Sequence, residues 1–360
     1  MQAIAMCINN LEFITQNEIK EILKISSDIV YSSRVMFNVK TDKDLAKFIY
    51  YSRSIIKAYL LIEKLEFKSS DEIMEKIKKL NFPYMKDTFV VRCERKGTHD
   101  FSSNDIEREA GEIIFSKSKL KVSLDDATTT IIIDIIDNIC FIGIDFTGIP
   151  LTKREYRIKL ATNPLNAVLA HCMLKIGEYE YKNSLLDPFC KSGEIPIEAV
   201  LYALSIPNFK TEKLFFNKLI KTNFKDKKTE KDLEIYAADS LQNNLKSGEI
   251  NARILSLQKS IKFSRVDIEW LDTKFKENSI DKVITFPIYP TSTLPIKIVE
   301  KIYKELFYHL EFIMKKKRSV VILTPVPELI ERYASQHSFK KQKEINLNYM
   351  NQQFTILKFI

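Results

Sequence analysis

The segment that most constrains the fold of this chain is Asp187-Pro188-Phe189-Cys190-Lys191-Ser192-Gly193. The apolar pair Leu185-Leu186 precedes it, and an apolar run with helical spacing, Ile195 to Leu201, follows it. A short buried strand that ends in a tight loop and opens a helix is typical of the ligand-binding edge of an α/β sheet. The loop has neither GxGxxG spacing nor a GKS or GKT ending, which argues against a dinucleotide site and against a P-loop. A strand-to-helix turn in some other α/β protein is the alternative.

Three further strands are predicted after this loop, at 233–239, 261–267 and 280–287. Asp187, Asp239 and Asp267 end the first three strands of this half, and Phe286-Pro287-Ile288-Tyr289 ends the fourth. Ligands of doubly wound sheets bind beyond the carboxyl ends of the strands. A carboxylate accepts hydrogen bonds from hydroxyl and amino groups, so it suits a ribose diol or an adenine amino group. The alternative is that these acidic residues only cap loops and helices.

The remaining C-terminal pattern predicts helices at 164–176, 241–255 and 297–314 and a strand at 319–325. Two runs at 340–349 and 353–360, separated by a turn, predict an antiparallel hairpin at the sheet edge. We expect the cluster Lys315 to Arg318 to end a helix, where cations favour the helix dipole. We also expect 209–231, with Lys225-Asp226-Lys227-Lys228, to be a polar surface excursion.

Residues 1–65 alternate strand-like and helix-like runs in the β-α-β-β-α-β order of a ferredoxin-like fold. A helix near 70–80 and a strand at 88–95 follow. Ser103 or Asn104 can cap a helix over 105–116. The β-branched run 128–143 predicts a hairpin or central strands. The whole chain is therefore expected to be an α/β protein of two or three domains.

The charge balance favours an anionic partner. The 360 residues carry a net charge of +9 with a pI of about 9.0, and nucleic acid is the usual partner of such proteins. The candidate phosphate-binding cations of the first half and the connector are Arg92, Arg95, Lys96, Arg108, Lys153, Arg154 and Arg157. Ordinary surface charge is the alternative for all of them.

Other classes are disfavoured by what the composition lacks. The five cysteines form no C-x-x-C pair and the four histidines have no metal-ligand spacing, so we expect neither a disulfide scaffold nor a metal site. Cys190 has no histidine nearby in sequence, so we interpret it as a packing residue rather than a nucleophile. No basic region precedes an apolar core at the N-terminus, and no apolar run reaches about 18 residues. We therefore expect a cytoplasmic protein without a membrane partner.

The quoted motifs resemble those of RNA methyltransferases that carry a THUMP domain. The loop at Asp187 is similar to their cofactor loop, DPFCGSGTIPIEAA, and the run from Arg92 to Arg108 is similar to the THUMP core. The stretch from Asp145 to Arg157 is similar to the connector that leads into their catalytic domain. The resemblance implies a ferredoxin-like N-terminal domain at 1–65, a THUMP RNA-binding domain at 66–160 and a Rossmann-like class I methyltransferase domain at 161–360. It also implies a tRNA or another structured RNA as partner.

The same resemblance assigns roles to single residues. S-adenosylmethionine is the implied cofactor, with its ribose on Asp239, its adenine on Asp267 and its methionine end near Asp187. The other implied cofactor-binding residues are Phe189, Cys190, Ser192, Gly193, Ser240 and Ile268. The implied catalytic tetrad is Phe286, Pro287, Ile288 and Tyr289, where the family has Asn/Asp-Pro-Pro-Tyr. In that motif the Asn or Asp side chain and the proline carbonyl accept hydrogen bonds from the target amine, and the aromatic residue stacks on the base.

Two departures from these motifs bear on activity. Lys191 stands where the family has glycine, and Phe286 has no hydrogen-bond acceptor. Loss of one positioned polar group costs about 10² to 10³ in rate. We therefore expect weak or undetectable methyl transfer, which Phe286→Asn, alone or with Lys191→Gly, should raise. The leading hypothesis is a methyltransferase that acts on the exocyclic amine of a guanine in tRNA. The alternatives are an inactive RNA-binding relative and a DNA amine methyltransferase, which would lack the THUMP-like half.

Overall fold

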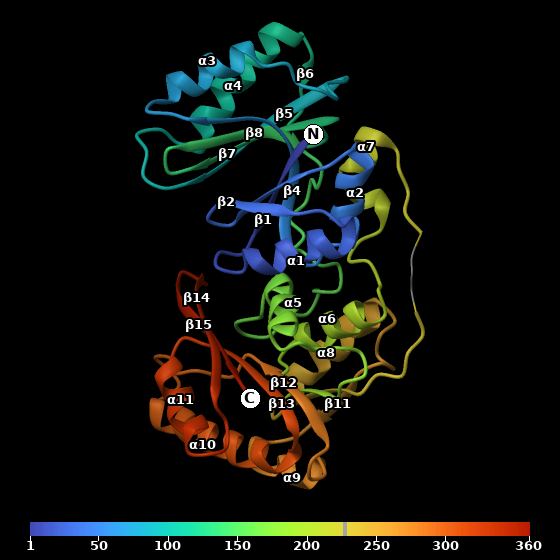
Figure 1. Cartoon of the computed structure of the whole chain (residues 1–360), viewed down its shortest axis with the longest axis vertical. Coiled ribbons are helices and arrows are strands. Elements are labelled where there is room, and N and C mark those ends of the chain that lie inside the picture. Colours follow the sequence, from blue (N-terminus) through green and yellow to red (C-terminus); the bar gives the residue numbers. More distant parts are fainter. Residues whose placement is uncertain (226–228) are drawn as a thin grey trace. The chain divides into compact units, whose positions relative to one another are not determined.

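The computed structural model describes residues 1–225 and 229–360 and divides into two compact units. The first unit comprises Met1–Cys7, Thr15–Leu151 and Phe209–Lys225, and the second comprises Ile8–Ile14, Thr152–Asn208 and Asp226–Ile360. Both are α/β units built on a twisted sheet (Figure 1). The α/β class predicted from the alternating apolar runs is confirmed.

The first unit is organised around one eight-stranded sheet of order β2-β3-β1-β4-β8-β7-β5-β6. Its strands are β1 Gln2–Cys7, β2 Ser27–Tyr31, β3 Arg34–Asn38, β4 Ile55–Glu66, β5 Thr88–Lys96, β6 Lys121–Val122, β7 Thr129–Ile136 and β8 Ile139–Asp145. Its helices are α2 Asp42–Tyr51, α3 Ser70–Lys79 and α4 Ser103–Ser118, together with most of α1 Glu12–Leu23. The predicted hairpin at 128–143 is β7 and β8, which pair antiparallel. The predicted boundary between residues 65 and 66 falls inside β4, which pairs with both β1 and β8.

The helix α4 begins earlier than the sequence pattern predicts. Its N-cap is Ser102, not Ser103 or Asn104, because the Ser102 hydroxyl accepts the backbone N–H of Asp105 and the Asp105 carboxylate accepts the N–H of Ser102. This reciprocal arrangement is a capping box, which satisfies two backbone donors at once. Only Ser103 and Asn104 were predicted as caps from the sequence, whereas Asp105 at the third helical position selects Ser102.

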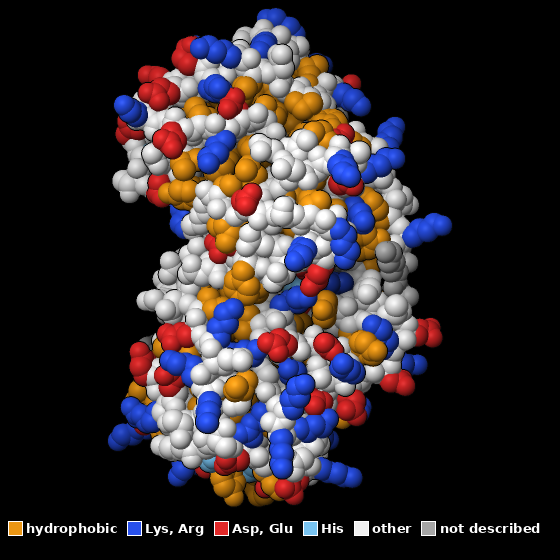
Figure 2. Space-filling model, in the orientation of Figure 1, with side chains coloured by type: hydrophobic (Ala, Val, Ile, Leu, Met, Phe, Trp, Pro, Cys, Tyr) orange, Lys and Arg blue, Asp and Glu red, His pale blue; other side chains and the backbone are white. Residues whose placement is uncertain are grey.

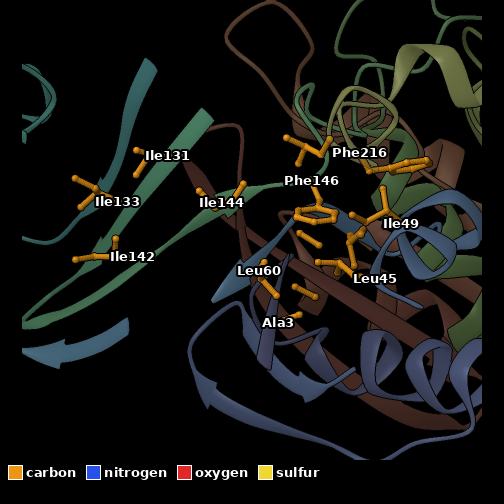
Figure 3. Packing of buried hydrophobic residues seen from close by; sticks show 14 of the residues in the cluster. Ala3, Leu45, Ile49, Leu60, Ile131, Ile133, Ile142, Ile144, Phe146 and Phe216 are labelled. Atoms are coloured by element: carbon orange, nitrogen blue, oxygen red, sulfur yellow. The ribbon is translucent and has the colours of Figure 1, made fainter. Parts of the chain in front are cut away.

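The insertion at 209–225 was predicted wrongly as part of a polar surface excursion. Phe209, Leu214, Phe216 and Leu219 are buried in the hydrophobic core of the first unit. Phe216 packs in the same cluster as Phe146 and Ile49 (Figure 3). The insertion contains the 3₁₀ helix η1 Thr211–Lys213 and the helix α7 Phe216–Ile220. Of the predicted basic run, residues 226–228 lie outside the described residues.

The second unit has a seven-stranded sheet of order β11-β10-β9-β12-β13-β15-β14. Its strands are β9 Leu185–Asp187, β10 Ile235–Asp239, β11 Lys262–Arg265, β12 Ile280–Thr285, β13 Met314–Thr324, β14 Lys341–Tyr349 and β15 Gln352–Phe359. The first five in the sheet order run parallel, and β15 and β14 form the predicted antiparallel terminal hairpin at the edge. The helices are α5 Ala167–Ile176, α6 Glu194–Ala203, α8 Gln242–Ile254, α9 Leu271–Lys274, α10 Ile296–Ile313 and α11 Pro327–Ser335, with the 3₁₀ helix η2 Ile268–Trp270.

Both faces of this second sheet are covered by helices. Alternate residues of the strands enter two hydrophobic clusters: Leu185 and Ile284 pack with residues of α5, α6 and α8, whereas Leu186 and Val283 pack with residues of α10 and α11. A parallel sheet buried on both faces is the doubly wound arrangement. The cluster Lys315 to Arg318 lies in β13 and does not end a helix as predicted, because α10 stops at Ile313.

Candidate functional site

The carboxyl ends of β9 and β10 and the segments that follow β11 and β12 surround a cavity of about 380 Å³ in the second unit. Its lining includes six residues of the predicted site, namely Phe189, Asp239, Ser240, Asp267, Ile268 and Ile288. Leu241, Asn244, Leu294 and Lys191 also line it and were not predicted as cofactor-binding residues. The volume is within the range of small-molecule sites, which is about 300 to 1,000 Å³.

Asp239 is the most highly coordinated carboxylate of the cavity. Its Oδ1 accepts the backbone N–H of Leu241 at 2.9 Å and the amide of Asn244 at 3.0 Å, and its Oδ2 accepts the backbone N–H of Lys191 at 3.0 Å. The side chain is only 5% exposed, so it is held in one orientation. Asp267, in contrast, is exposed at the start of η2. The two carboxylates therefore offer one rigid and one accessible acceptor at the same cavity.

Asp187 is buried beneath the loop and is not among the residues that line the cavity. Its Oδ1 accepts the hydroxyl of Thr285 at 2.7 Å and the backbone N–H of Phe189 at 3.2 Å. Burial raises the pKa of Asp187 to about 7, although both hydrogen bonds favour the charged form. This geometry makes Asp187 a support that fixes the loop to β12.

The turn between β9 and α6 is closed by backbone hydrogen bonds. The Cys190 N–H donates to Ala238 and the Gly193 N–H donates to Cys190. Gly193 has a φ of +83° and packs closely against Gly248. A Cβ added to Gly193 would lie 3.2 Å from the Cα of Gly248. Ser192 is buried and donates to Glu194. Cys190 is buried, and burial raises the pKa of its thiol, so it packs and is not a nucleophile.

Lys191 lies against Phe286, a contact that joins the two departures from the family motifs. The Lys191 Nζ is 3.5 Å from the centroid of the Phe286 ring. Lys191 adopts a φ of +48°, which is unusual for a residue with a side chain, and is only 8% exposed. Burial lowers the pKa of Lys191 to about 8. The sequence presents Lys191 and Phe286 as two separate departures from the family motifs, whereas in the structure their side chains are in contact.

The tetrad after β12 is held by an aromatic cluster. Phe286 is 2% exposed, stacks on Tyr289 with ring centroids 5.8 Å apart, and meets Phe354 edge-on. The Tyr289 hydroxyl accepts the amide of Asn163 at 3.1 Å. The carbonyl of Ile288 accepts the Tyr303 hydroxyl at 2.7 Å. Pro287, which lies between Phe286 and Ile288 in the sequence, is buried.

The predicted basic residues divide into inward and outward groups. The structure contradicts the prediction that Arg154 binds RNA. Its guanidinium is fully buried and pairs with Glu198 at 3.0 Å, so it is unavailable to a phosphate. Arg157 is half-buried, donates to the carbonyl of Leu165 and lies 3.8 Å from Glu194. The outward group, which is at least partly exposed, is Arg92, Arg95, Lys96, Arg108 and Lys153.

The described part of the chain holds neither a cluster of metal-binding side chains nor a membrane-spanning helix. No group of three or more His, Cys, Asp or Glu residues there could hold a metal ion. In the same ranges, 1–225 and 229–360, no helix combines the length and hydropathy needed to span a membrane.

Comparison with known proteins assigns the fold and the family. The model of the RMKL-like methyltransferase domain matches residues 154–354, more than half of the chain. The chain belongs to this methyltransferase family. The THUMP model matches residues 67–145. A tRNA (guanine(6)-N2)-methyltransferase of Methanocaldococcus jannaschii is 28% identical over 362 residues, which cover 94% of each chain. One of Archaeoglobus fulgidus is 29% identical over 283 residues, 76% of this chain and 70% of the relative.

A solved structure shows the same fold over the whole length of this methyltransferase. The crystal structure of SMU.472, assigned as a methyltransferase and complexed with SAH, superposes with a TM-score of 0.83, 18% identity and coverage of 99% of this chain and 97% of that chain. The predicted architecture, a THUMP-containing N-terminal half and a Rossmann-like methyltransferase half, is confirmed. The comparisons favour the methyltransferase over the inactive RNA-binding relative.

Proposed function

We propose that this methyltransferase transfers a methyl group from S-adenosylmethionine to the exocyclic N2 of a guanine in tRNA, position 6 being the position that the names of its relatives give. The single observation that carries the proposal is the cavity at the carboxyl ends of the parallel strands, with Asp239 and Asp267 on its wall, in a chain whose relatives carry that activity. Methyl transfer to unmodified tRNA, followed by analysis of the modified nucleoside, tests it.

The residues present fit the cofactor. The cavity of about 380 Å³ has two carboxylates for hydroxyl and amino donors and apolar walls from Phe189, Ile268 and Leu294. Bound S-adenosylmethionine supplies an electrophilic methyl group on a positively charged sulfur. Asp239 would hold the ribose and Asp267 the adenine, while Asp187 keeps the loop in place through Thr285 and Phe189. Tyr289 offers an aromatic face for the target base.

Replacing Asp239 with asparagine should weaken cofactor binding. The substitution preserves the volume of the side chain but removes the negative charge of the group that would accept hydrogen bonds from the ribose hydroxyls. We therefore expect the binding free energy to weaken by about 1 to 3 kcal/mol. Calorimetry with S-adenosylmethionine gives the dissociation constant. Asp232→Ala, which removes an exposed carboxylate of the same unit, is the matched control and should bind like the wild type. Equal binding by Asp239→Asn and the wild type would exclude Asp239 as a cofactor ligand.

The tRNA would be held through phosphates by the cations of the first unit. Basic and acidic side chains are interspersed over the face drawn in Figure 2, so net charge alone does not define the surface. The strand end Arg92, Arg95 and Lys96 provides three cations, of which Lys96 is exposed and Arg95 contacts His99. The insertion adds five exposed lysines to the same unit, Lys210, Lys213, Lys218, Lys221 and Lys225.

Replacing Arg92, Arg95 and Lys96 together with alanine should weaken tRNA binding and flatten its dependence on salt. Removal of one contact between a cation and a phosphate lowers the slope of log K against log salt by about 0.7 to 0.9. Binding titrations at several salt concentrations measure both quantities. The control removes three exposed lysines elsewhere in the same unit, Lys68, Lys78 and Lys79. If both triple variants changed affinity and slope equally, net charge would explain the effect and the strand end would not be a binding site.

A further inference from the structure

Lys191 and Phe286 form one structural element at the catalytic corner. The loop bends at Lys191 so that its side chain lies over Phe286, the residue that follows β12, and Nζ is 3.5 Å from the centroid of the Phe286 ring. Phe286 cannot move away, because Tyr289 and Phe354 pack against it. The Lys191 amine therefore lies on the face of the Phe286 ring, and Phe286 is the position at which the family motif has a side-chain acceptor.

Burial opposes a positive charge on Nζ of Lys191, whereas the groups around it favour one. Among the described residues, no carboxylate forms an ion pair with Lys191, which is 8% exposed. Three carboxyl groups raise the pKa of Lys191 through their charge: Asp187 at the end of β9, Asp239 at the end of β10 and Glu194 in α6. Each is engaged elsewhere, by Thr285, by Leu241 and Asn244, and by Ser192. The face of the Phe286 ring also favours a cation at Nζ. Burial outweighs these carboxyl groups and lowers the pKa of Lys191 to about 8.

We propose that Lys191 replaces the missing acceptor of the tetrad: its uncharged Nζ accepts a hydrogen bond from the target amine and then takes the proton that the amine releases. This inference rests on the proposed function. The exocyclic nitrogen forms a bond to the methyl group as the bond between that methyl group and the cofactor sulfur breaks, and the cofactor leaves as uncharged S-adenosylhomocysteine. The proton that the methylated nitrogen releases passes to Nζ, which becomes an ammonium and later returns the proton to solvent. A positively charged cofactor in the same cavity disfavours the ammonium, because like charges lower a lysine pKa. Cofactor binding thereby prepares the uncharged amine.

The first test needs neither RNA nor turnover. The protein is titrated by calorimetry at pH 7 with S-adenosylmethionine, and separately with S-adenosylhomocysteine, in two buffers of different ionisation enthalpy. We expect the charged ligand to release a large fraction of one proton and the uncharged ligand to release clearly less. Lys191→Met should abolish the difference, while Lys262→Met should keep it. Lys262 is a matched control, since its Nζ lies 4.7 Å from the centroid of Tyr236 outside the cavity.

The second test is the pH profile of methyl transfer to unmodified tRNA. The wild-type rate should rise with pH until Lys191 is uncharged, near pH 8 or below. Lys191→Met and Lys191→Arg should each lower it by about 10² to 10⁴. The double variant Lys191→Gly with Phe286→Asn should recover activity with a flatter profile, because it restores the acceptor of the family motif. This replaces the expectation that Phe286→Asn alone suffices, since that change leaves the Lys191 side chain over the site.

The outcomes separate the inference from the proposed function. Binding of both ligands without a difference in proton release overturns the role of Lys191 alone, as does a wild-type rate and profile in Lys191→Met. Proton release with no methylation of tRNA by the wild type overturns the proposed function. Failure to bind either ligand overturns both.

Discussion

Arg154→Ala is expected to lower the free energy of unfolding of the second unit by about 3 to 5 kcal/mol. Arg154 and Glu198 are both fully buried side chains, and the Tyr156 hydroxyl donates to the same carboxylate oxygen at 3.1 Å. Removing the guanidinium leaves a charged carboxylate buried without its ion pair and with only one hydroxyl donor. Urea unfolding monitored by circular dichroism measures the change.

The control for this prediction removes both charges. Arg154→Met combined with Glu198→Leu replaces the ion pair with apolar groups of similar size, and such replacements are often neutral or stabilising. We therefore expect the double variant to recover most of the loss. A single variant within about 1 kcal/mol of the wild type would contradict the buried pair. The result also tests the sequence-based assignment of Arg154 to RNA binding, since a phosphate ligand would not affect stability in this way.

Phe216→Ala is expected to lower the free energy of unfolding of the first unit by about 3 to 5 kcal/mol. Phe216 is fully buried in the cluster that contains Ile49 and Phe146, although it belongs to an insertion between α6 and β10 (Figure 3). Its loss should leave a cavity that the surrounding residues fill only partly. Thermal unfolding of the variant provides the measurement.

The matched change is Phe115→Ala, which truncates a 48% exposed phenylalanine of α4 in the same unit. It should have a small effect, because surface substitutions are usually within about 0.5 kcal/mol. If Phe216→Ala were equally mild, the insertion would be an appendage of the first unit and not part of its core. That outcome would restore the surface excursion predicted from the sequence.

Much of the fold was predictable because apolar periodicity determines the strands and helices locally. The parallel strands and the terminal hairpin follow from apolar runs separated by turn residues. The insertion was missed because exposed lysines alternate with its buried apolar residues, and the prediction of a polar surface segment relied on the lysines. The lysine-rich start of β13 was missed for a similar reason, since Lys316 and Lys317 are exposed on a strand that directly follows α10.

The site was predictable only in part. Asp239 and Asp267 could be placed at the cavity because carboxyl ends of parallel strands meet at one edge of a sheet. The contact of Lys191 with Phe286 could not be predicted, because it depends on a left-handed bend in one loop and on the aromatic cluster around another. Asn251 was also missed. It is a buried residue within α8 whose amide donates to the carbonyls of Lys159 and Ser192, and no sequence pattern marks such a residue.

The most direct test of the proposed function is transfer of a labelled methyl group from S-adenosylmethionine to unmodified tRNA by the wild-type protein, with the product digested to nucleosides. We predict that the label appears in N2-methylguanosine and that it maps to position 6. Asp239→Asn should reduce the label at subsaturating cofactor. Label in another nucleoside, or cofactor binding without any label in the tRNA, would contradict the proposed function.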